Sequence, residues 1–250
     1  MLRTFSQPTP VFGGFLLESA TDTRSDLTRF VLSREKRPRQ SAAATRGGDR
    51  GSRAEGTKTT QEKNVPKALN KIPPAVAKRA KQIKVLLMDV DGTITDGSVT
   101  LLSQPDGSAL EIKTFDAHDG QGMTLARTAG LRTGVITGRE SAALRRRARE
   151  LDIEFVYEKQ PHKIAAYDEI LKKAGVQESE VAFLGDDLPD LTVMRRVGLA
   201  VAVGDAAIEV KRAAHHVTKA IGGKGAAREL VEVILKSKGI WEQMIDKARA

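Results

Sequence analysis

Two aspartates that stand two residues apart follow a short apolar run of the chain. Residues 85–88 are all apolar and predict a buried strand, and Asp89 and Asp91 come at its end. On an extended backbone this spacing points both carboxylates to the same side, where they repel each other and lose hydration. A divalent cation or a role in phosphoryl transfer would explain two such anions at the end of a buried strand.

Further polar residues follow the later apolar runs of the chain. A hydroxyl, two cations and three more carboxylates occur in this way, at Thr137, Arg139, Lys163, Asp186, Asp187 and Asp190. Carboxylates can hold a hard cation such as Mg²⁺, while a hydroxyl and a lysine can bind the oxygens of a phosphoryl group. Each residue alone has an ordinary alternative: Thr137 could cap a helix, Lys163 could be solvated, and Asp187 could cap a helix start.

Strands and helices alternate from residue 82 onwards. The predicted strands are residues 85–88, 134–136, 155–156, 181–184 and 199–203. The predicted helices are residues 121–129, 140–151, 162–174, 187–197, 206–214 and 224–236, and 73–80 could form a short lead-in helix. This alternation predicts an α/β fold with a parallel sheet between two layers of helices. Ligands of such sheets bind beyond the carboxyl ends of the strands, where the polar residues fall.

One segment interrupts the alternation. Residues 98–103 and 109–115 flank Gln-Pro-Asp-Gly-Ser, a strong turn signal, and predict a β-hairpin that projects from the first strand. Only 48 residues separate Asp89 from Thr137, and only 26 separate Thr137 from Lys163. The hairpin, a loop and a helix use this length, so no cap domain is expected over the site.

Composition limits the function classes. The net charge of +9 lies entirely in residues 1–80, which carry 16 basic and 7 acidic residues, and the remainder is neutral. Residues 1–80 are therefore predicted as a disordered basic extension, 81–240 as the folded domain and 241–250 as a tail. The chain has no Cys, which excludes disulfides and thiolate sites, and no apolar stretch long enough for a membrane span.

The joint pattern resembles the haloacid dehalogenase superfamily of phosphatases. The shared parts are Asp-x-Asp-x-Thr from Asp89, the hydroxyl of Thr137, Lys163, and Gly-Asp-Asp-x-x-x-Asp from residue 185. Within it, the chain is most similar to the capless 3-deoxy-D-manno-octulosonate 8-phosphate phosphatase group. That likeness also includes Thr-Gly-Arg at 137–139, the three arginines at 145–147 and Gly-Gly-Lys-Gly-Ala-Ala-Arg-Glu at 222–229.

The resemblance implies a Rossmann-like three-layer fold and a role for each site residue. Asp89 would attack phosphorus, and Asp91 would act as general acid and then as base. Thr137 and Lys163 would hold phosphoryl oxygens. Asp89, the backbone carbonyl of Asp91 and Asp186 would bind Mg²⁺, with Asp187 and Asp190 supporting metal-bound waters or Lys163.

Substrate contacts are also implied. Besides Asp91 and Lys163, they would come from Asp116, Ala117, His118, Asp119, Gly120, Gly138, Arg139 and Arg147. Arginines suit the carboxylate of an ulosonate sugar, although Arg147 could equally lie on a solvated helix face. The chain departs from the group at His118, where Arg is usual, and at Thr124, where Lys is frequent.

The group further implies a cytoplasmic homotetramer of lipopolysaccharide-precursor synthesis, in which hairpins from four subunits meet and a neighbour covers the site. Two alternatives stay open. The same chemistry could act on another phosphate ester, such as a nonulosonate 9-phosphate or a small phosphorylated metabolite. A non-catalytic scaffold tethered to nucleic acid by the basic extension is the third hypothesis, and the intact set of acids counts against it.

Overall fold

The computed structural model describes residues 72–249, and their centre is a six-stranded parallel sheet. The strands run in the order β5-β4-β1-β6-β7-β8. Their bounds are Val85–Met88 (β1), Arg132–Ile136 (β4), Phe155–Tyr157 (β5), Val181–Gly185 (β6), Leu199–Ala202 (β7) and His216–Val217 (β8). Strand β1 pairs with β4 on one side and with β6 on the other, so its carboxyl end lies at the middle of the sheet edge.

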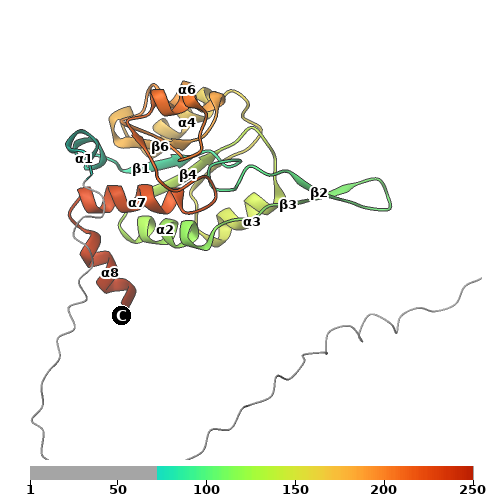
Figure 1. Ribbon diagram of the computed structural model, residues 1–250, viewed down its shortest axis with the longest axis horizontal. Helices are drawn as coiled ribbons and strands as arrows, with labels where there is room; N and C mark the ends of the chain where they lie inside the picture. The colour runs from blue at the N-terminus through green and yellow to red at the C-terminus, as the bar shows by residue number, and fades with distance from the viewer. Residues whose placement is uncertain (1–71, 250) are drawn as a thin grey trace, which may run out of the picture. The chain divides into compact units, whose positions relative to one another are not determined.

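Helices cover both faces of the sheet, and the predicted three-layer α/β fold is confirmed (Figure 1). One layer holds α2 (Ala117–Thr128), α3 (Ala142–Glu150) and α7 (Ala226–Ser237). The other holds α4 (Ile164–Ala174), α5 (Leu191–Met194) and α6 (Ile208–Ala213). Two further helices contact α7, namely α1 (Pro74–Ala80) and α8 (Trp241–Arg249).

The apolar composition of β1 follows from its position. A parallel strand covered by helices on both faces has no solvent side, so it is a continuous apolar run rather than an alternating one. All four residues of β1 are buried, and so are the five of β6. This central pair forms a rigid base for the residues that follow it, which are Asp89 and Asp186.

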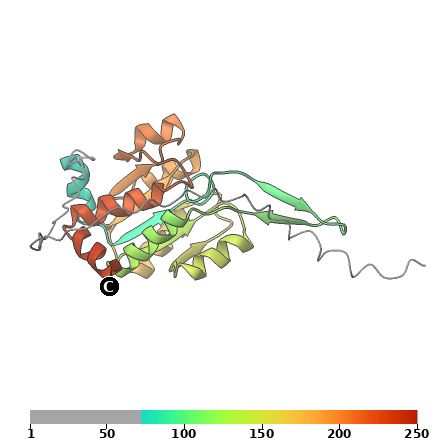
Figure 2. The same cartoon turned by 60° about the horizontal axis from the view of Figure 1, so that its bottom comes forward.

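The predicted hairpin is present and projects from the edge of the sheet at which β1 ends (Figures 1 and 2). Its strands are β2 (Thr100–Ser103) and β3 (Ala109–Ile112), paired antiparallel. The turn is stabilised by Asp106, whose carboxylate accepts hydrogen bonds from the Ser108 amide at 2.9 Å and hydroxyl at 2.6 Å. Gly107 takes a φ of +82°, a left-handed value that a glycine adopts at little cost. Among the described residues, the segment between β1 and β4 contains only the hairpin and α2, and no cap domain.

Several boundaries differ from the prediction. Helix α2 begins at Ala117 rather than residue 121, because Asp116 caps it by accepting from the amides of His118 and Asp119. The helix predicted at 187–197 is split into a 3₁₀ turn at Leu188–Asp190 and the short α5. Strand β8 and helix α8 were not predicted, since β8 has only two residues and α8 follows Gly239 in a segment taken as a tail.

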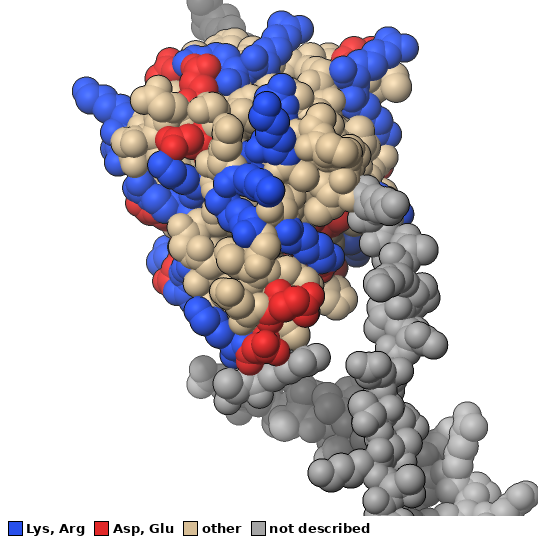
Figure 3. Space-filling view, turned by 90° about the vertical axis from the view of Figure 1, so that its left-hand side faces the viewer, with Lys and Arg blue, Asp and Glu red and all other residues tan. Residues whose placement is uncertain are grey.

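The lead-in helix was predicted within the extension, and α1 occupies that place with Val76 and Ala80 buried. Disorder was predicted for residues 1–80; residues 1–71 lie outside the described residues, and residues 74–80 form α1 instead. On the face of the domain opposite the hairpin, basic side chains outnumber acidic ones (Figure 3).

None of the helices among the described residues has the length and apolar character needed to cross a membrane.

Candidate active site

A cavity of about 400 Å³ opens at the carboxyl ends of β1, β4 and β6. Most of its lining residues are polar or charged and come from the ends of these strands and from the loop before α4. The lining residues are Asp89, Asp91, Thr137, Gly138, Arg139, Gln160, Pro161, Lys163, Asp186, Asp187, Pro189 and Asp190. The structure therefore brings together every residue that the sequence assigned to catalysis or metal binding.

Lys163 forms the centre of a buried ionic cluster. Its ammonium nitrogen lies 2.5 Å from Asp89 Oδ1 and 2.6 Å from Asp190 Oδ1. The side chains of Lys163 and Asp190 are only 4% and 1% exposed. A buried lysine is stable only when it is paired, and here two carboxylates from β1 and the turn after β6 supply the pairing. The alternative of a solvated Lys163 is wrong.

Asp190 also fixes the backbone of Asp186 through hydrogen bonds. Its Oδ2 accepts hydrogen bonds from the amides of Asp186 at 2.9 Å and Asp187 at 3.3 Å, so both its oxygens are engaged. Asp186 itself accepts from the Thr93 hydroxyl at 2.7 Å. Gly92 is required beside it, since its φ is +87° and a Cβ there would lie 2.2 Å from Asp186 Oδ2.

Three carboxylates, from Asp89, Asp186 and Asp190, offer oxygens within 4.8 Å of one another. Burial raises the pKa of Asp89 to about 6, although Lys163 opposes the shift. Burial also raises the pKa of Asp186 to about 7; the Thr93 hydrogen bond opposes this, and repulsion from Asp89 and Asp190 adds to it. The single ammonium of Lys163 therefore does not balance the negative charge of the three carboxylates. A divalent cation at Asp89 and Asp186 fits this donor set, whereas Asp190 has no free oxygen for it.

Thr137 and Gly138 line the cavity directly after β4. Thr137 ends β4 and is 2% exposed; its amide donates to Tyr157 O at 2.9 Å, which fixes the turn beyond the strand. Its hydroxyl accepts from the Arg139 amide at 3.3 Å, but α3 begins only at Ala142 with Ser141 as its N-cap, so the alternative of Thr137 as a helix cap is wrong. The hydroxyl proton remains available to an acceptor in the cavity.

Asp91 is held between two cations, one of which the sequence analysis missed. Lys113, directly after β3, forms an ion pair with Asp91 Oδ1, and Arg139 Nε lies 3.7 Å from Asp91 Oδ2. Glu111 on β3 contacts both Lys113 and Arg139. The available signal was the spacing of Glu111 and Lys113, which places them on one side of the predicted hairpin strand.

The other predicted substrate residues do not line the cavity. Asp116 caps α2, and Ala117 and His118 are exposed, with the His118 side chain 86% accessible. Asp119 is 5% exposed, and its carboxylate accepts from the amides of Gly225 at 3.1 Å and Arg228 at 2.9 Å. Asp119 thus holds the start of α7, a structural contact that spans more than a hundred residues of sequence.

Arg147 belongs to the same separate region. A Cβ on Gly120 would lie 2.2 Å from Arg147 Nη2, so the guanidinium rests directly on the glycine backbone. Arg147 also pairs with Glu150 at 3.4 Å and lines a small recess of about 20 Å³ together with Asp116, Asp119 and Gly120. Of the implied substrate contacts, the structure brings Asp91, Gly138, Arg139 and Lys163 to the cavity and leaves Asp116–Gly120 and Arg147 outside it.

The glycine-rich segment 222–225 packs against the loop after β1. The amide of Gly223 donates to Thr93 O at 2.9 Å, and a Cβ on Gly222 would lie 1.8 Å from Gly92 O. The amide of Gly222 donates to Asp205 Oδ1 at 2.9 Å, so both amides already have partners outside the cavity. The segment fixes the position of the loop that carries Asp91.

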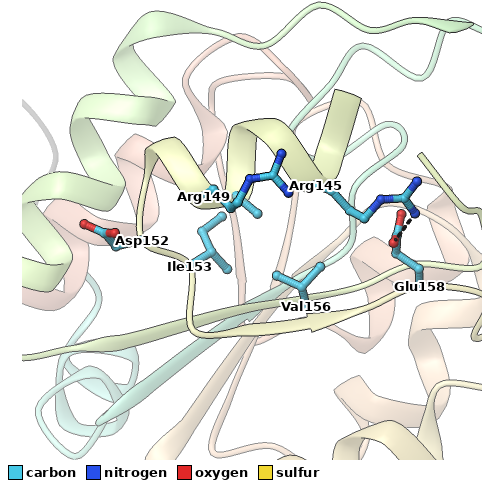
Figure 4. Close-up of a pocket in the computed structure, with 7 residues that line it drawn as sticks. Arg145, Arg149, Asp152, Ile153, Val156 and Glu158 are labelled. Carbon is cyan, nitrogen blue, oxygen red and sulfur yellow. Dashed lines mark hydrogen bonds and ion pairs between the residues drawn. The ribbon is translucent and has the colours of Figure 1, made fainter. Parts of the chain in front are cut away.

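A larger recess of about 620 Å³ lies elsewhere, between α3 and β5 (Figure 4). Arg145 and Arg149 border it, and Arg145 pairs with Glu158 at 2.8 Å. It contains no cluster of carboxylates with a lysine, so its size does not make it the catalytic centre.

Two sequence comparisons identify related proteins. Residues 144–230 match the family of haloacid dehalogenase-like hydrolases. The 3-deoxy-D-manno-octulosonate 8-phosphate phosphatase of Yersinia pestis is 41% identical over 160 residues, which are 64% of this chain and 83% of the relative.

Two solved phosphatase structures have a fold similar to that of this chain. The 3-deoxy-D-manno-octulosonate 8-phosphate phosphatase of Moraxella catarrhalis, in complex with magnesium, phosphate and the sugar acid KDO, has a TM-score of 0.65 and 35% identity. The match covers 69% of this chain and 97% of that one. The cobalt-bound phosphatase of Haemophilus influenzae has a TM-score of 0.61 and 37% identity, over 67% of this chain and 98% of that one.

Proposed function

The chain belongs to the haloacid dehalogenase-like hydrolases, and from this premise we propose that it hydrolyses 3-deoxy-D-manno-octulosonate 8-phosphate to the sugar acid and phosphate. The observation that carries the proposal is the buried cluster in which Lys163 joins Asp89 to Asp190 beside Asp186. An oxygen nucleophile, a cation and a group of carboxylates at one strand edge suit phosphoryl transfer. The intact cluster counts against a non-catalytic scaffold.

In the first step, an oxygen of Asp89 bonds to phosphorus while the bond from phosphorus to the sugar oxygen breaks. Asp91 gives a proton to the departing alkoxide, so the sugar leaves as an alcohol. The Thr137 hydroxyl and the Lys163 ammonium bind the phosphoryl oxygens and stabilise the charge that they carry in the transition state. The product is an aspartyl phosphate on Asp89.

In the second step, water attacks phosphorus and the bond to Asp89 breaks. Asp91, now a carboxylate, takes a proton from that water, and Asp89 returns to its ionised form. The location of Asp91 at the cavity supports both proton transfers. Its position two residues after Asp89 points both carboxylates to the same side of the chain, and both line the cavity.

The cofactor in this proposal is Mg²⁺, bound by Asp89, Asp186 and the backbone carbonyl of Asp91. When bound, the ion supplies positive charge that offsets repulsion between the carboxylates and the phosphoryl group. Asp190 supports the site indirectly, by holding Lys163 and the backbone of Asp186. Asp187 lines the cavity, and its side chain also caps the following 3₁₀ turn by accepting from Leu188 N at 2.8 Å.

Arg139 is the arginine that we assign to the substrate carboxylate. It lines the cavity and is 46% exposed on its side chain, so its guanidinium can meet an incoming anion. Arg147 lies outside the cavity and pairs with Glu150, which gives it a weaker claim to the same role.

A nonulosonate 9-phosphate is the second candidate substrate. Its support is two departures of the sequence from the resembling group, His118 in place of the usual Arg and Thr124 in place of a frequent Lys. Two cationic contacts would be weakened, which would reduce the preference for a particular sugar acid. Phosphate release in the presence of Mg²⁺ from a panel of both sugar-acid phosphates and small phosphorylated metabolites separates the two. A higher kcat/KM for the nonulosonate 9-phosphate would replace the first candidate by the second.

We also propose a homotetramer that acts in the cytoplasm. Leu101, Leu102, Leu110 and Ile112 on the hairpin are 50–59% exposed, an apolar surface that a neighbouring hairpin could cover. Without a cap domain, such a neighbour would also exclude water from the cavity. Sedimentation of the full chain tests the assembly, and fractionation of the source cell tests the location.

A further inference from the structure

Two charged residues at the inner end of the hairpin contact residues that line the cavity. Glu111 lies on β3 and Lys113 directly after it, two residues apart on one side of an extended segment. The rest of the hairpin is exposed, yet the Lys113 side chain is only 3% exposed. A lysine removed from water at this point needs charged partners.

One partner of Lys113 is Asp91, the proposed acid and base of the reaction, and the other is Glu111. The Lys113 ammonium pairs with Asp91 Oδ1 and lies 3.4 Å from Glu111 Oε1. The other oxygen of Asp91 lies 3.7 Å from Arg139 Nε. Each oxygen of the Asp91 carboxylate therefore faces a different cation, which restricts rotation of the side chain.

Glu111 holds both of these cations. One of its oxygens lies 3.3 Å from Arg139 Nη2 and 3.4 Å from Lys113 Nζ, and the other accepts a hydrogen bond from the Ser141 hydroxyl. Ser141 caps α3, so Glu111 joins the hairpin to a helix of the main domain. The four side chains form a closed network of Glu111, Lys113, Asp91 and Arg139 around one edge of the cavity.

We propose that Lys113 is a positioning residue for Asp91, and that Glu111 keeps Lys113 in place, so that the inner end of the hairpin fixes the carboxyl group that transfers the proton. The inference rests on the proposed function of Asp91 and adds a role that the aspartate cluster alone does not contain. Proton transfer is sensitive to placement, since a displacement of about 1 Å in a reacting group can cost about 100-fold in rate. Without Lys113, only the more distant Arg139 restrains Asp91.

Two aryl phosphates of matched shape test this. The p-nitrophenolate that leaves p-nitrophenyl phosphate is stable as an anion and departs readily without a proton. The phenolate that leaves phenyl phosphate is more basic and depends more on protonation, so only phenyl phosphate should depend strongly on a well-placed acid. Both lack the sugar carboxylate, so substrate binding through Arg139 does not enter. The variants are Lys113→Met and Glu111→Gln in the full chain with Mg²⁺, and Glu169→Gln, which breaks an exposed pair with Lys173 on α4, is the control.

We expect Lys113→Met to lower kcat/KM for phenyl phosphate at least about tenfold more than for p-nitrophenyl phosphate. Glu111→Gln should shift the same ratio in the same direction by a smaller factor, and Glu169→Gln should leave it unchanged. Equal losses on both substrates, or unchanged ratios in both variants, would overturn the inference. If the wild type hydrolyses aryl phosphates but not the sugar-acid phosphate, the proposed substrate fails while this test still decides the role of Lys113.

Discussion

The floor of the cavity, which is the cluster of Asp89, Lys163, Asp186 and Asp190, differs from the hairpin in what it buries and what it exposes. On the floor, charged groups are buried, and Lys163 and Asp190 find their partners within the same chain. On the hairpin, apolar side chains such as Leu101 and Leu110 are more than half exposed. The groups proposed for phosphoryl transfer thus lie together in one chain, whereas the hairpin leaves an apolar surface uncovered among the described residues. The network of Glu111 and Lys113 is where the two regions meet.

The largest effect should come from the nucleophile on the floor. Asp89→Asn should lower kcat by at least about 10³-fold, because an amide cannot form the aspartyl phosphate. The measurement is phosphate release at saturating substrate. Asp168→Asn, an exposed position on α4, is the matched control and should retain wild-type turnover. Comparable activity in both variants would remove Asp89 from the mechanism.

The second effect concerns charge balance on the floor. Lys163→Met leaves Asp89 and Asp190 buried without their cation, so the free energy of unfolding should fall by about 3 kcal/mol. Turnover should fall by about 100-fold as the phosphoryl oxygens lose a charged donor. Chemical denaturation and steady-state kinetics measure the two losses.

Lys173→Met is the control for that experiment, since Lys173 makes an exposed pair with Glu169. Its effect on stability should be below about 1 kcal/mol. If Lys163→Met lowered the free energy of unfolding as little as Lys173→Met, the stability of the buried cluster would not depend on the Lys163 ammonium.

The third effect is smaller and lies on the hairpin. Leu102→Ser combined with Leu110→Ser should lower the mass in solution and raise KM for the sugar-acid phosphate about tenfold. The kcat for p-nitrophenyl phosphate should change less than about threefold, because the floor is untouched. Ile208→Ser, which is 54% exposed on α6, controls for loss of surface apolar area. An unchanged mass would remove the hairpin from assembly.

The smallest effect is a dependence of stability on pH without metal. The pKa values of Asp89 and Asp186 are raised from 3.8 to about 6 and about 7, so the folded chain binds more protons than the unfolded chain between those limits. Stability from these groups should therefore fall as pH rises from about 4 to 7. Thermal unfolding in a chelator should show Tm falling over this range by a few degrees, and Mg²⁺ should raise Tm most near neutral pH. A Tm that rises across this window would contradict the assigned charge balance.

Local signals in the sequence were sufficient for the floor of the cavity. The apolar run of β1 and the acids that follow it predict a strand end, and the Gln-Pro-Asp-Gly-Ser turn predicts the hairpin, because both patterns are short-range. Asp119 was assigned to substrate but contacts the start of α7, more than a hundred residues away, and no local pattern reports such a contact. Lys113 was missed for a related reason, since its burial depends on how the hairpin lies against Asp91.

Trapping the phosphoryl group on the protein tests whether Asp89 is the nucleophile. The full chain with Mg²⁺ is mixed with 3-deoxy-D-manno-octulosonate 8-phosphate, quenched in acid within one turnover, digested and mapped by mass spectrometry. We predict phosphate on the peptide that contains Asp89 in the wild type and none in Asp89→Asn. Turnover of the substrate with no phosphate on Asp89 at any time point, or phosphate on another residue, would contradict the account.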